Sequence, residues 1–448
     1  MNRLPLLAGD DLAAVFAWRP EGPVSVGDYL ADVHALAERL PATGHLLNLC
    51  HDRYRFAVGF AAGLLRGMTS LQPSSQSPET FRRLAADFPD LVALCDDPVE
   101  TPELSRFDFP LLVRGRSTPT IPQIAVDHLA AILFTSGSTG LPQAQKKTWG
   151  KLVLNGRAGA QALGLDRRPH ALVGTVPVQH SYGFESTFLL ALHGGCPFWS
   201  GKPFYPQDIA SALAAVPQPR LLVTTPFHLS ALLAAGIDLP AVDLLLSATA
   251  PLSTKLATEA ETRTGAPLLE IYGSTESGQL ASRRTTDGAT WTLLPGVRLE
   301  QDGDHTLACA GHVEGRVALS DVIELLPDGR FLLHGRHADL INIAGKRTSL
   351  AYLNHQLAAV PGVADGAFFL PDEESPDGIT RLAAFVVAPG LTARQITVAL
   401  RQRIEAIFLP RPLVLVDELP RNSTGKLPRS GLQTLYAEHV ERAGHGRS

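Results

Sequence analysis

Short apolar runs alternate with helical segments along most of this chain, and this alternation restricts the fold more than any other feature. The runs 46–50, 91–95 and 244–247 have the length and composition of buried strands, whereas 53–65 and 226–234 have helical spacing. Strands that alternate with helices form a parallel sheet with helices on its faces. We therefore predict an α/β fold, in which ligands bind beyond the carboxyl ends of the strands.

The pattern changes in the last third of the chain, which predicts more than one domain. A chain of 448 residues is too long for one ordinary core. Residues 291–334 contain short strands and tight turns, and the chain after Ala338 has the pattern of a compact α+β unit. We predict a large N-terminal domain over residues 1–337, with parallel and mixed sheets, flanking helices and a small β-rich section. A smaller C-terminal domain is expected over residues 338–448.

Composition excludes several classes of protein. The net charge of −5 gives no basic surface for nucleic acid. No window of about 18 uncharged apolar residues is present, so no membrane span is expected. The four cysteines are far apart in the sequence, which predicts reduced thiols in a cytoplasmic protein rather than disulfides or a zinc site. They are Cys50, Cys95, Cys196 and Cys309.

A loop rich in glycine and hydroxyl groups follows the apolar run 129–133. We call it the phosphate loop, and it consists of Thr135, Ser136, Gly137, Ser138, Thr139 and Gly140. Its glycines permit close approach of the backbone, and its N–H and O–H groups are donors for phosphate oxygens. An ordinary surface loop has the same composition. It is not a Walker A loop, because no Gly-Lys-Ser/Thr sequence closes it.

Other polar segments follow the predicted strands at the same edge of the sheet. They are His180, the segment 248–250 and the turn 272–276. Glu276 beside a phosphate loop suits Mg²⁺, and Tyr272 suits stacking on a purine, although a surface Glu and a core Tyr explain them as well. Asp321, at a later strand end, is either an acceptor for ribose hydroxyls or a turn residue.

Lys426 lies on a glycine-bearing loop, 419–426, in a chain that contains few lysines. A compact ammonium group can follow a phosphate oxygen through a reaction, whereas a solvated surface Lys is the alternative. A dinucleotide-binding oxidoreductase is disfavoured, because no G-x-G-x-x-G sequence opens a βαβ unit. No G-x-S-x-G sequence supports a hydrolase, and no third ligand supports a zinc site at His180 and His228.

Four motifs together, over about residues 25–430, resemble the adenylate-forming enzymes: acyl- and aryl-CoA synthetases, adenylation domains of peptide synthetases, and luciferases. These motifs are the phosphate loop, Tyr272–Glu276, Gly335-Arg336 and Asn422–Lys426. The short chain looks most like the small ligases of aryl-polyene and xanthomonadin-type pigment clusters, which load an aromatic acid onto an acyl carrier protein.

The resemblance implies a role for each motif. The phosphate loop would hold the β- and γ-phosphates of ATP, and the adenine site would consist of Tyr272 with Ala248, Thr249 and Ala250. Gly273 and Ser274, which follow Tyr272, would also bind the nucleotide. Asp321 would bind the ribose, with Arg336 as its basic partner. The implied catalytic residues are Lys426, which bridges the carboxylate and the α-phosphate, Thr275 at the α-phosphate, Glu276 as the Mg²⁺ ligand, and His180 as a gate between the acyl pocket and the thiol tunnel.

The implied reaction has two halves. A carboxylic acid, expected to be aromatic and hydroxybenzoate-like, attacks MgATP to give acyl-AMP and pyrophosphate. The acyl group then passes to a phosphopantetheine thiol of an acyl carrier protein or of free CoA. Gln143 and Ala144 stand where the family usually has Lys-Gly, Ala338 replaces a hinge Asp or Lys, and Ser320 replaces a Gly. A non-catalytic nucleotide-binding homologue is the remaining alternative.

Overall fold

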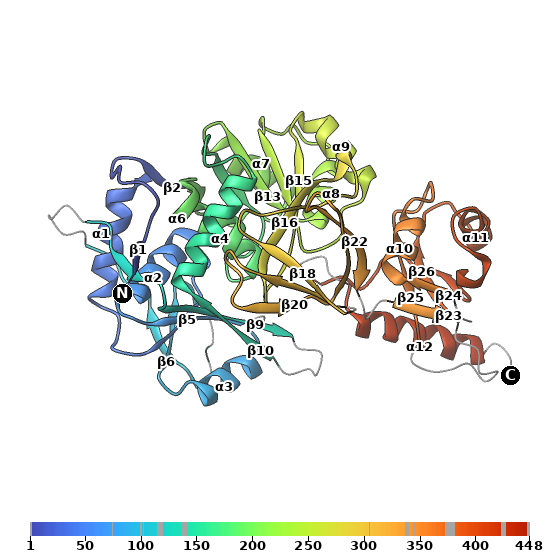
Figure 1. The fold of residues 1–448 in the computed structure, drawn as a ribbon, viewed down its shortest axis with the longest axis horizontal. Helices are drawn as coiled ribbons and strands as arrows, with labels where there is room; N and C mark the ends of the chain where they lie inside the picture. Colours follow the sequence, from blue (N-terminus) through green and yellow to red (C-terminus); the bar gives the residue numbers. More distant parts are fainter. Residues whose placement is uncertain are drawn as a thin grey trace.

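The computed structural model describes residues 2–73, 75–98, 101, 103–113, 120–136, 142–303, 305–336, 340–343, 346–371, 381–422 and 427–445. Two large sheets and the helices around them form the body of the protein (Figure 1). A smaller unit, coloured orange to red, stands to one side of this body. This arrangement confirms the predicted α/β class with large N-terminal and smaller C-terminal parts.

The first sheet has six strands in the order β10-β9-β5-β4-β6-β7. Its bounds are β4 His45–Asn48, β5 Thr69–Gln72, β6 Leu91–Cys95, β7 Ser105–Asp108, β9 Leu129–Ser136 and β10 Pro142–Thr148. The strands β5, β4, β6, β7 and β9 run parallel, and β10 is antiparallel to β9. The β9–β10 hairpin therefore carries the phosphate loop beyond the carboxyl end of β9.

The second sheet has nine strands in the order β17-β16-β15-β14-β13-β11-β12-β2-β3. Its bounds are β2 Val15–Arg19, β3 Gly22–Ser25, β11 Ala171–Gly174, β12 Phe198–Trp199, β13 Arg220–Thr224, β14 Leu244–Ser247, β15 Leu268–Ser274, β16 Gly278–Arg284 and β17 Thr292–Leu293. The central strands from β15 to β2 are parallel. Their carboxyl ends therefore meet at one edge.

Helices fill the space between the sheets and cover their outer faces. The largest core joins residues of both sheets to α1 Val26–Ala37, α2 Arg53–Leu65, α4 Trp149–Ala162, the π-helix η1 Phe184–Leu189 and α6 Leu190–Gly194. A second core packs the nine-stranded sheet against α7 Pro206–Ala214, α8 Pro226–Ala234 and α9 Thr254–Thr264. A third places α3 Pro78–Asp87 on the outer face of the six-stranded sheet.

The remaining elements form a β-rich section and the C-terminal unit. The section contains β18 Arg298–Asp302, β19 His305–Cys309, β20 Arg316–Ala318, β21 Asp321–Leu325 and β22 Phe331–Arg336. The C-terminal unit contains β23 Leu340–Ile343, β24 Lys346–Ser349, α10 Leu350–Ala358, β25 Asp365–Phe369, β26 Ala383–Val387, α11 Ala393–Arg401, β27 Leu413–Leu415 and α12 Arg429–His445. The minor elements are β1 Arg3–Pro5, β8 Gln123–Ala125, α5 Ser181–Gly183, η2 Thr285–Asp287 and η4 Ala406–Phe408.

Two cores of the C-terminal unit are built from residues after 340 alone, as far as the described chain extends. This separation agrees with a domain boundary near Ala338, although Ala338 itself lies outside the described residues and the boundary stays a prediction. None of the described helices is both long and apolar enough to span a membrane. All four cysteines are buried and unpaired, as expected.

Candidate active site

The carboxyl edge of the nine-stranded sheet brings together the loops predicted to form a cleft. The loop after β11 contacts the turn after β15 through a hydrogen bond between Ser181 Oγ and Thr275 Oγ1, at 3.2 Å. The buried Tyr182 hydroxyl donates to the Leu246 carbonyl of β14, at 3.0 Å. His180, which precedes Ser181 and forms the N-cap of α5, therefore lies beside the Tyr272–Glu276 turn.

The Tyr272–Glu276 motif forms the tip of the hairpin between β15 and β16. A bulge shifts the register between Tyr272 and Gly273. A Cβ on Gly273 would lie 2.3 Å from the Gly278 carbonyl, and Gly278 has φ +76°, so both positions require glycine. Ser274 and Ser277 close the tip, because the backbone N–H of each donates to the other's hydroxyl at 3.2 Å. The turn is therefore rigidly held beyond the sheet.

Tyr272 and Asp321 are direct neighbours. The Tyr272 hydroxyl donates to Asp321 Oδ2 at 2.8 Å, which joins the predicted adenine and ribose residues across 49 positions of sequence. The Tyr272 ring packs against Trp291 and Phe331. In the β21–β22 pairing Arg336 is the cross-strand partner of Asp321, and the side chain of Arg336 is not described. The β-rich section therefore brings the ribose residues to the hairpin.

The segment 248–250 leaves the sheet next to Tyr272. Ser247 is paired with Glu270 in the parallel β14–β15 ladder, so the following residues run beside Ile271 and Tyr272. Thr249 has φ +79°, a left-handed conformation that is costly for a β-branched residue. Its buried hydroxyl has no hydrogen-bond partner within the described chain. A strained backbone and an unpaired hydroxyl beside Tyr272 are typical of a ligand site.

Lys147 of β10 forms a hydrogen bond with the Tyr272–Glu276 turn. Its side chain is only 5% exposed, and its Nζ donates to the Glu276 carbonyl at 2.8 Å. Burial lowers the pKa of Lys147, and the neighbouring carboxylates of Glu185, Glu314 and Glu276 oppose this shift. The half-buried Glu276 carboxylate makes no hydrogen bond or ion pair with another described residue. It therefore has oxygen atoms to offer to a hard cation such as Mg²⁺.

A buried polar network lies behind this turn. Glu185 of η1 is fully enclosed, and burial raises the pKa of its carboxyl to about 7, although Lys147 and a hydrogen bond from Asn155 act in the opposite direction. His312 Nε2 is 2.6 Å from the Gln279 carbonyl of β16, and burial lowers its pKa to about 4. Charged and polar groups are expensive to bury unless they are paired, so the network fixes the geometry of the hairpin.

This network predicts a specific pH dependence of stability. Between pH 4.5 and about 7 the folded state retains the Glu185 proton that the unfolded state has lost, so the free energy of unfolding falls as pH rises. Glu185→Gln cannot ionise and should lack this fall, a difference on the order of 3 kcal/mol for a shift of this size. Urea midpoints at pH 5, 6, 7 and 8 test it, with the exposed Glu259→Gln as control. Parallel profiles for Glu185→Gln and the wild type would contradict it.

Several predicted site residues fall where the structure is silent. Gly137, Ser138, Thr139, Gly140, Ala338 and Lys426 lie outside the described residues. At the base of the phosphate loop Thr135 pairs with Gln143, and Ser136 pairs with Pro142. The structure therefore places the two ends of the phosphate loop at the β9–β10 hairpin. The roles predicted for the loop and for Lys426 stay predictions.

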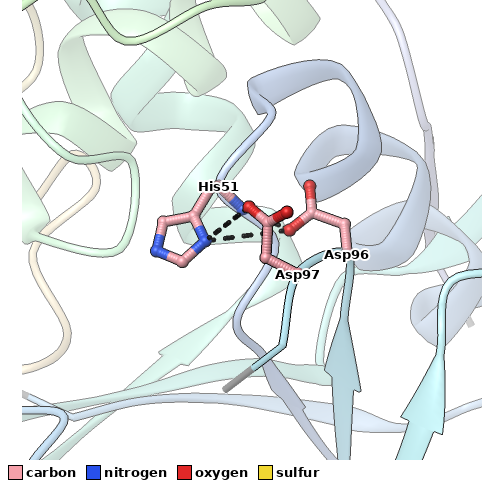
Figure 2. A group of neighbouring side chains, drawn as sticks. All are labelled: His51, Asp96 and Asp97. Atoms are coloured by element: carbon pink, nitrogen blue, oxygen red, sulfur yellow. Dashed lines mark hydrogen bonds and ion pairs between the residues drawn. The ribbon is translucent and has the colours of Figure 1, made fainter.

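One other group of potential metal ligands lies at the carboxyl edge of the six-stranded sheet. Figure 2 shows His51, Asp96 and Asp97 facing one another, with His51 Nδ1 3.3 Å from Asp97 Oδ2. Asp96 already accepts from two backbone N–H groups, those of His51 at 2.8 Å and Asp52 at 3.0 Å. These bonds order the chain just before α2. We assign the group to this structural task, because nothing else in the described part of the chain indicates a metal there.

The residues expected to contact ATP were predicted from the sequence, whereas the buried residues that support them were not. Lys147, Glu185 and Lys202 were not among the residues predicted to form the site. A charged residue in an apolar helical run, as Glu185 is in Gly183–Leu192, was the available signal. Such a residue needs a buried partner, and the sequence alone does not name it.

Comparison with known proteins identifies the family. The profile of the AMP-binding enzyme family matches residues 61–316, and that of the AMP-binding enzyme C-terminal domain matches residues 353–426. The chain therefore belongs to the AMP-binding enzymes. The prediction of an acid–thiol ligase of the AMP-forming type is confirmed, since the matched relatives are acid–CoA ligases.

Two relatives and one solved structure illustrate the similarity. A 4-coumarate–CoA ligase of Rhodobacter capsulatus is 31% identical over 277 residues, which cover 62% of this chain and 68% of the relative. A 4-chlorobenzoate–CoA ligase of an Arthrobacter species is 26% identical over 378 residues, covering 74% and 70%. ATP-bound MatB from Rhodopseudomonas palustris has a TM-score of 0.81 at 19% identity, covering 96% of this chain and 97% of that one. At that identity the likeness concerns the fold alone.

Proposed function

We propose that this enzyme adenylates an aromatic carboxylic acid and then transfers the acyl group to a phosphopantetheine thiol, with an acyl carrier protein as the acceptor. The observation that carries the proposal is the junction of three segments at one edge. The Ser181–Thr275 and Tyr272–Asp321 hydrogen bonds join the loop after β11, the β15–β16 turn and the β-rich section. An ATP molecule can contact all three segments at once, so that its adenine, its ribose and its α-phosphate each have a partner.

Each residue then has a defined task. Tyr272 and the segment 248–250 bind adenine, and Asp321 accepts hydrogen bonds from the ribose hydroxyls. Thr275 donates to the α-phosphate. Lys147 keeps the Glu276 carbonyl in place, which aims the Glu276 carboxylate. Mg²⁺, held by Glu276, would neutralise phosphate charge while the carboxylate of the acid approaches.

The proposed reaction has two steps. A carboxylate oxygen attacks the α-phosphorus, the bond to the bridging oxygen breaks, and pyrophosphate leaves. The thiol then attacks the acyl carbon of acyl-AMP, AMP leaves with the attacking oxygen, and the thiol proton passes to solvent. Positioning and charge neutralisation do most of this work, because the acid and ATP are both anionic.

The aromatic substrate is supported by relatives named for 4-coumarate and 4-chlorobenzoate. These relatives are named as CoA ligases, so free CoA is the second candidate acceptor. Pyrophosphate release with benzoates, cinnamates and fatty acids tests the first half of the proposal. Incubation of the active acid with CoA or with holo-acyl carrier protein, followed by mass spectrometry, tests the acceptor. Thioester formation on CoA at least as fast as on every carrier protein tried would favour free CoA.

A further inference from the structure

Buried polar atoms without partners gather along the carboxyl edge of the nine-stranded sheet, in the part of the chain that the structure describes. Ser200 Oγ follows β12, His228 Nε2 follows β13, and Ser247 Oγ ends β14. Each of these residues is at most 4% exposed. A buried polar atom without a hydrogen bond destabilises the folded state, so three of them at one edge indicate a ligand with polar atoms of its own.

His228 provides the most directed of these atoms. It lies in the first turn of α8, and its Nδ1 is 2.9 Å from the hydroxyl of the N-cap residue Thr225. That contact fixes the ring, while Nε2 stays buried and unpaired. Burial and the neighbouring Lys202 lower the pKa of His228, so a neutral imidazole is favoured. Edge contacts with Phe204 and Phe227 complete its surroundings.

Lys202, in the loop after β12, supplies charge next to this imidazole. Lys202 is an exposed residue whose partial burial, together with the neighbouring Arg53, lowers the pKa of its ammonium group, and no described carboxylate forms an ion pair with it. Arg53 is itself buried and donates to the carbonyls of Gly174, Val176 and Gly201. The Lys202 ammonium group lies close enough to the buried Arg53 guanidinium for the two positive charges to interact, and this favours an approaching anion or a strongly polar oxygen.

The strand order places this pair at the far end of the proposed acid. From β15, which leads into the turn with Thr275 and Glu276, the order runs β14, β13, β11, β12. Neighbouring strands are about 4.8 Å apart, so β13 lies about 10 Å and β12 about 19 Å from β15. A substituted benzoate or cinnamate whose carboxylate lies at Thr275 would extend along this edge toward His228. Lys202 lies near enough to His228 to lower the pKa of its imidazole.

We propose that Lys202 and His228 bind a hydrogen-bond-accepting oxygen at the end of the acid opposite the activated carboxylate, either a phenolic hydroxyl or a second carboxylate. This inference rests on the proposed function. Lys202 donates to that oxygen, and His228 Nε2 donates to a carboxylate or accepts from a hydroxyl, depending on its tautomer. A saturated fatty chain would leave the buried His228 Nε2 without a partner, so the site selects against it.

The test measures kcat/KM for pyrophosphate release with four benzoates that carry methyl, hydrogen, hydroxyl or carboxylate at the 4-position, the four matching cinnamates, and octanoate. The wild type should prefer an oxygen-bearing acid over its methyl analogue by at least about a hundredfold. Lys202→Met should reduce this ratio to below about tenfold when the preferred group is carboxylate. His228→Leu should reduce it most when the preferred group is hydroxyl. Lys255→Met, at an exposed position of α9, is the control that keeps the ratio.

The outcomes separate the two proposals. Turnover of the methyl or unsubstituted acid as efficient as that of every oxygen-bearing acid would overturn the role of Lys202 and His228 and leave adenylation intact. Ratios unchanged in both folded variants would overturn it as well, and the wild-type ratio decides the matter if a variant does not fold. Absence of pyrophosphate release with every acid would instead contradict the proposed function on which the inference depends.

Discussion

Replacing Lys426 by alanine is expected to lower the rate of pyrophosphate formation by about 10²–10³-fold, the usual cost of one preorganised charge at a transition state. Thioester formation from preformed acyl-AMP should stay within a few-fold of the wild-type rate. The reason is that an ammonium group between the carboxylate and the α-phosphate assists only the step in which both are present. The two half-reactions are measured separately, with exposed Lys255→Ala as control.

The two half-reactions are expected to differ because the loop that contains Lys426 is attached to the C-terminal unit. Lys426 lies outside the described residues, but Leu419 and Leu427 on either side of it pack into the same C-terminal core. Arg421 of this segment is held by Asp365 of β25 at 2.7 and 2.8 Å. The lysine therefore belongs to the C-terminal unit, and we propose that rotation near residues 336–340 withdraws it after adenylation. Equal loss in both half-reactions would contradict this separation of roles.

Replacing Glu276 by glutamine is expected to raise the Mg²⁺ concentration needed for half-maximal adenylation by at least about tenfold and to lower the maximal rate by about 10²-fold. A neutral amide keeps the size of the side chain but is a weaker ligand for a hard cation. The Lys147 contact uses the Glu276 backbone carbonyl, so it remains in the variant. Mg²⁺ titration of pyrophosphate release measures both effects.

Two further variants show whether the effect belongs to the metal. Exposed Glu259→Gln should behave as the wild type. Lys147→Met removes the support of the turn without touching the carboxylate, and it should lower the maximal rate with a smaller change in Mg²⁺ requirement. A Glu276→Gln enzyme with an unchanged Mg²⁺ titration would show that this carboxylate does not bind the metal.

The sequence predicted local elements well where apolar spacing and end signals agreed. The bounds of α2, α8, β6 and β14 match the predicted segments residue for residue. The strand β5, Thr-Ser-Leu-Gln, was not predicted, because its side chains are mostly polar. It is buried because it lies between the strands β4 and β9. The helical stretch after β11 is not regular, since a π-helical segment lies between α5 and α6 at Phe184–Leu189, where Glu185 is buried.

The same distinction applies to the candidate site, where some residues were predictable from local sequence and others were not. The residues expected to contact ATP follow strand ends, so local pattern and family resemblance located them. Contacts that depend on the packing of distant segments, such as Tyr272 with Asp321 and Lys147 with Glu276, have no local signal. The same holds for the approach of Lys202 to His228, which arises only from the order of β12, β11 and β13 in the sheet. The order and pairing of strands in the sheet therefore could not be predicted from the sequence.

The central claim is that the acid is activated as an acyl-AMP, and an isotope experiment tests it most directly. The acid, labelled with ¹⁸O in its carboxylate, is turned over with ATP and thiol, and the nucleotide product is analysed by mass spectrometry. Attack of the carboxylate on the α-phosphorus predicts AMP that carries one ¹⁸O atom, together with unlabelled pyrophosphate. Formation of ADP with ¹⁸O in inorganic phosphate, or of AMP without label, would contradict the account.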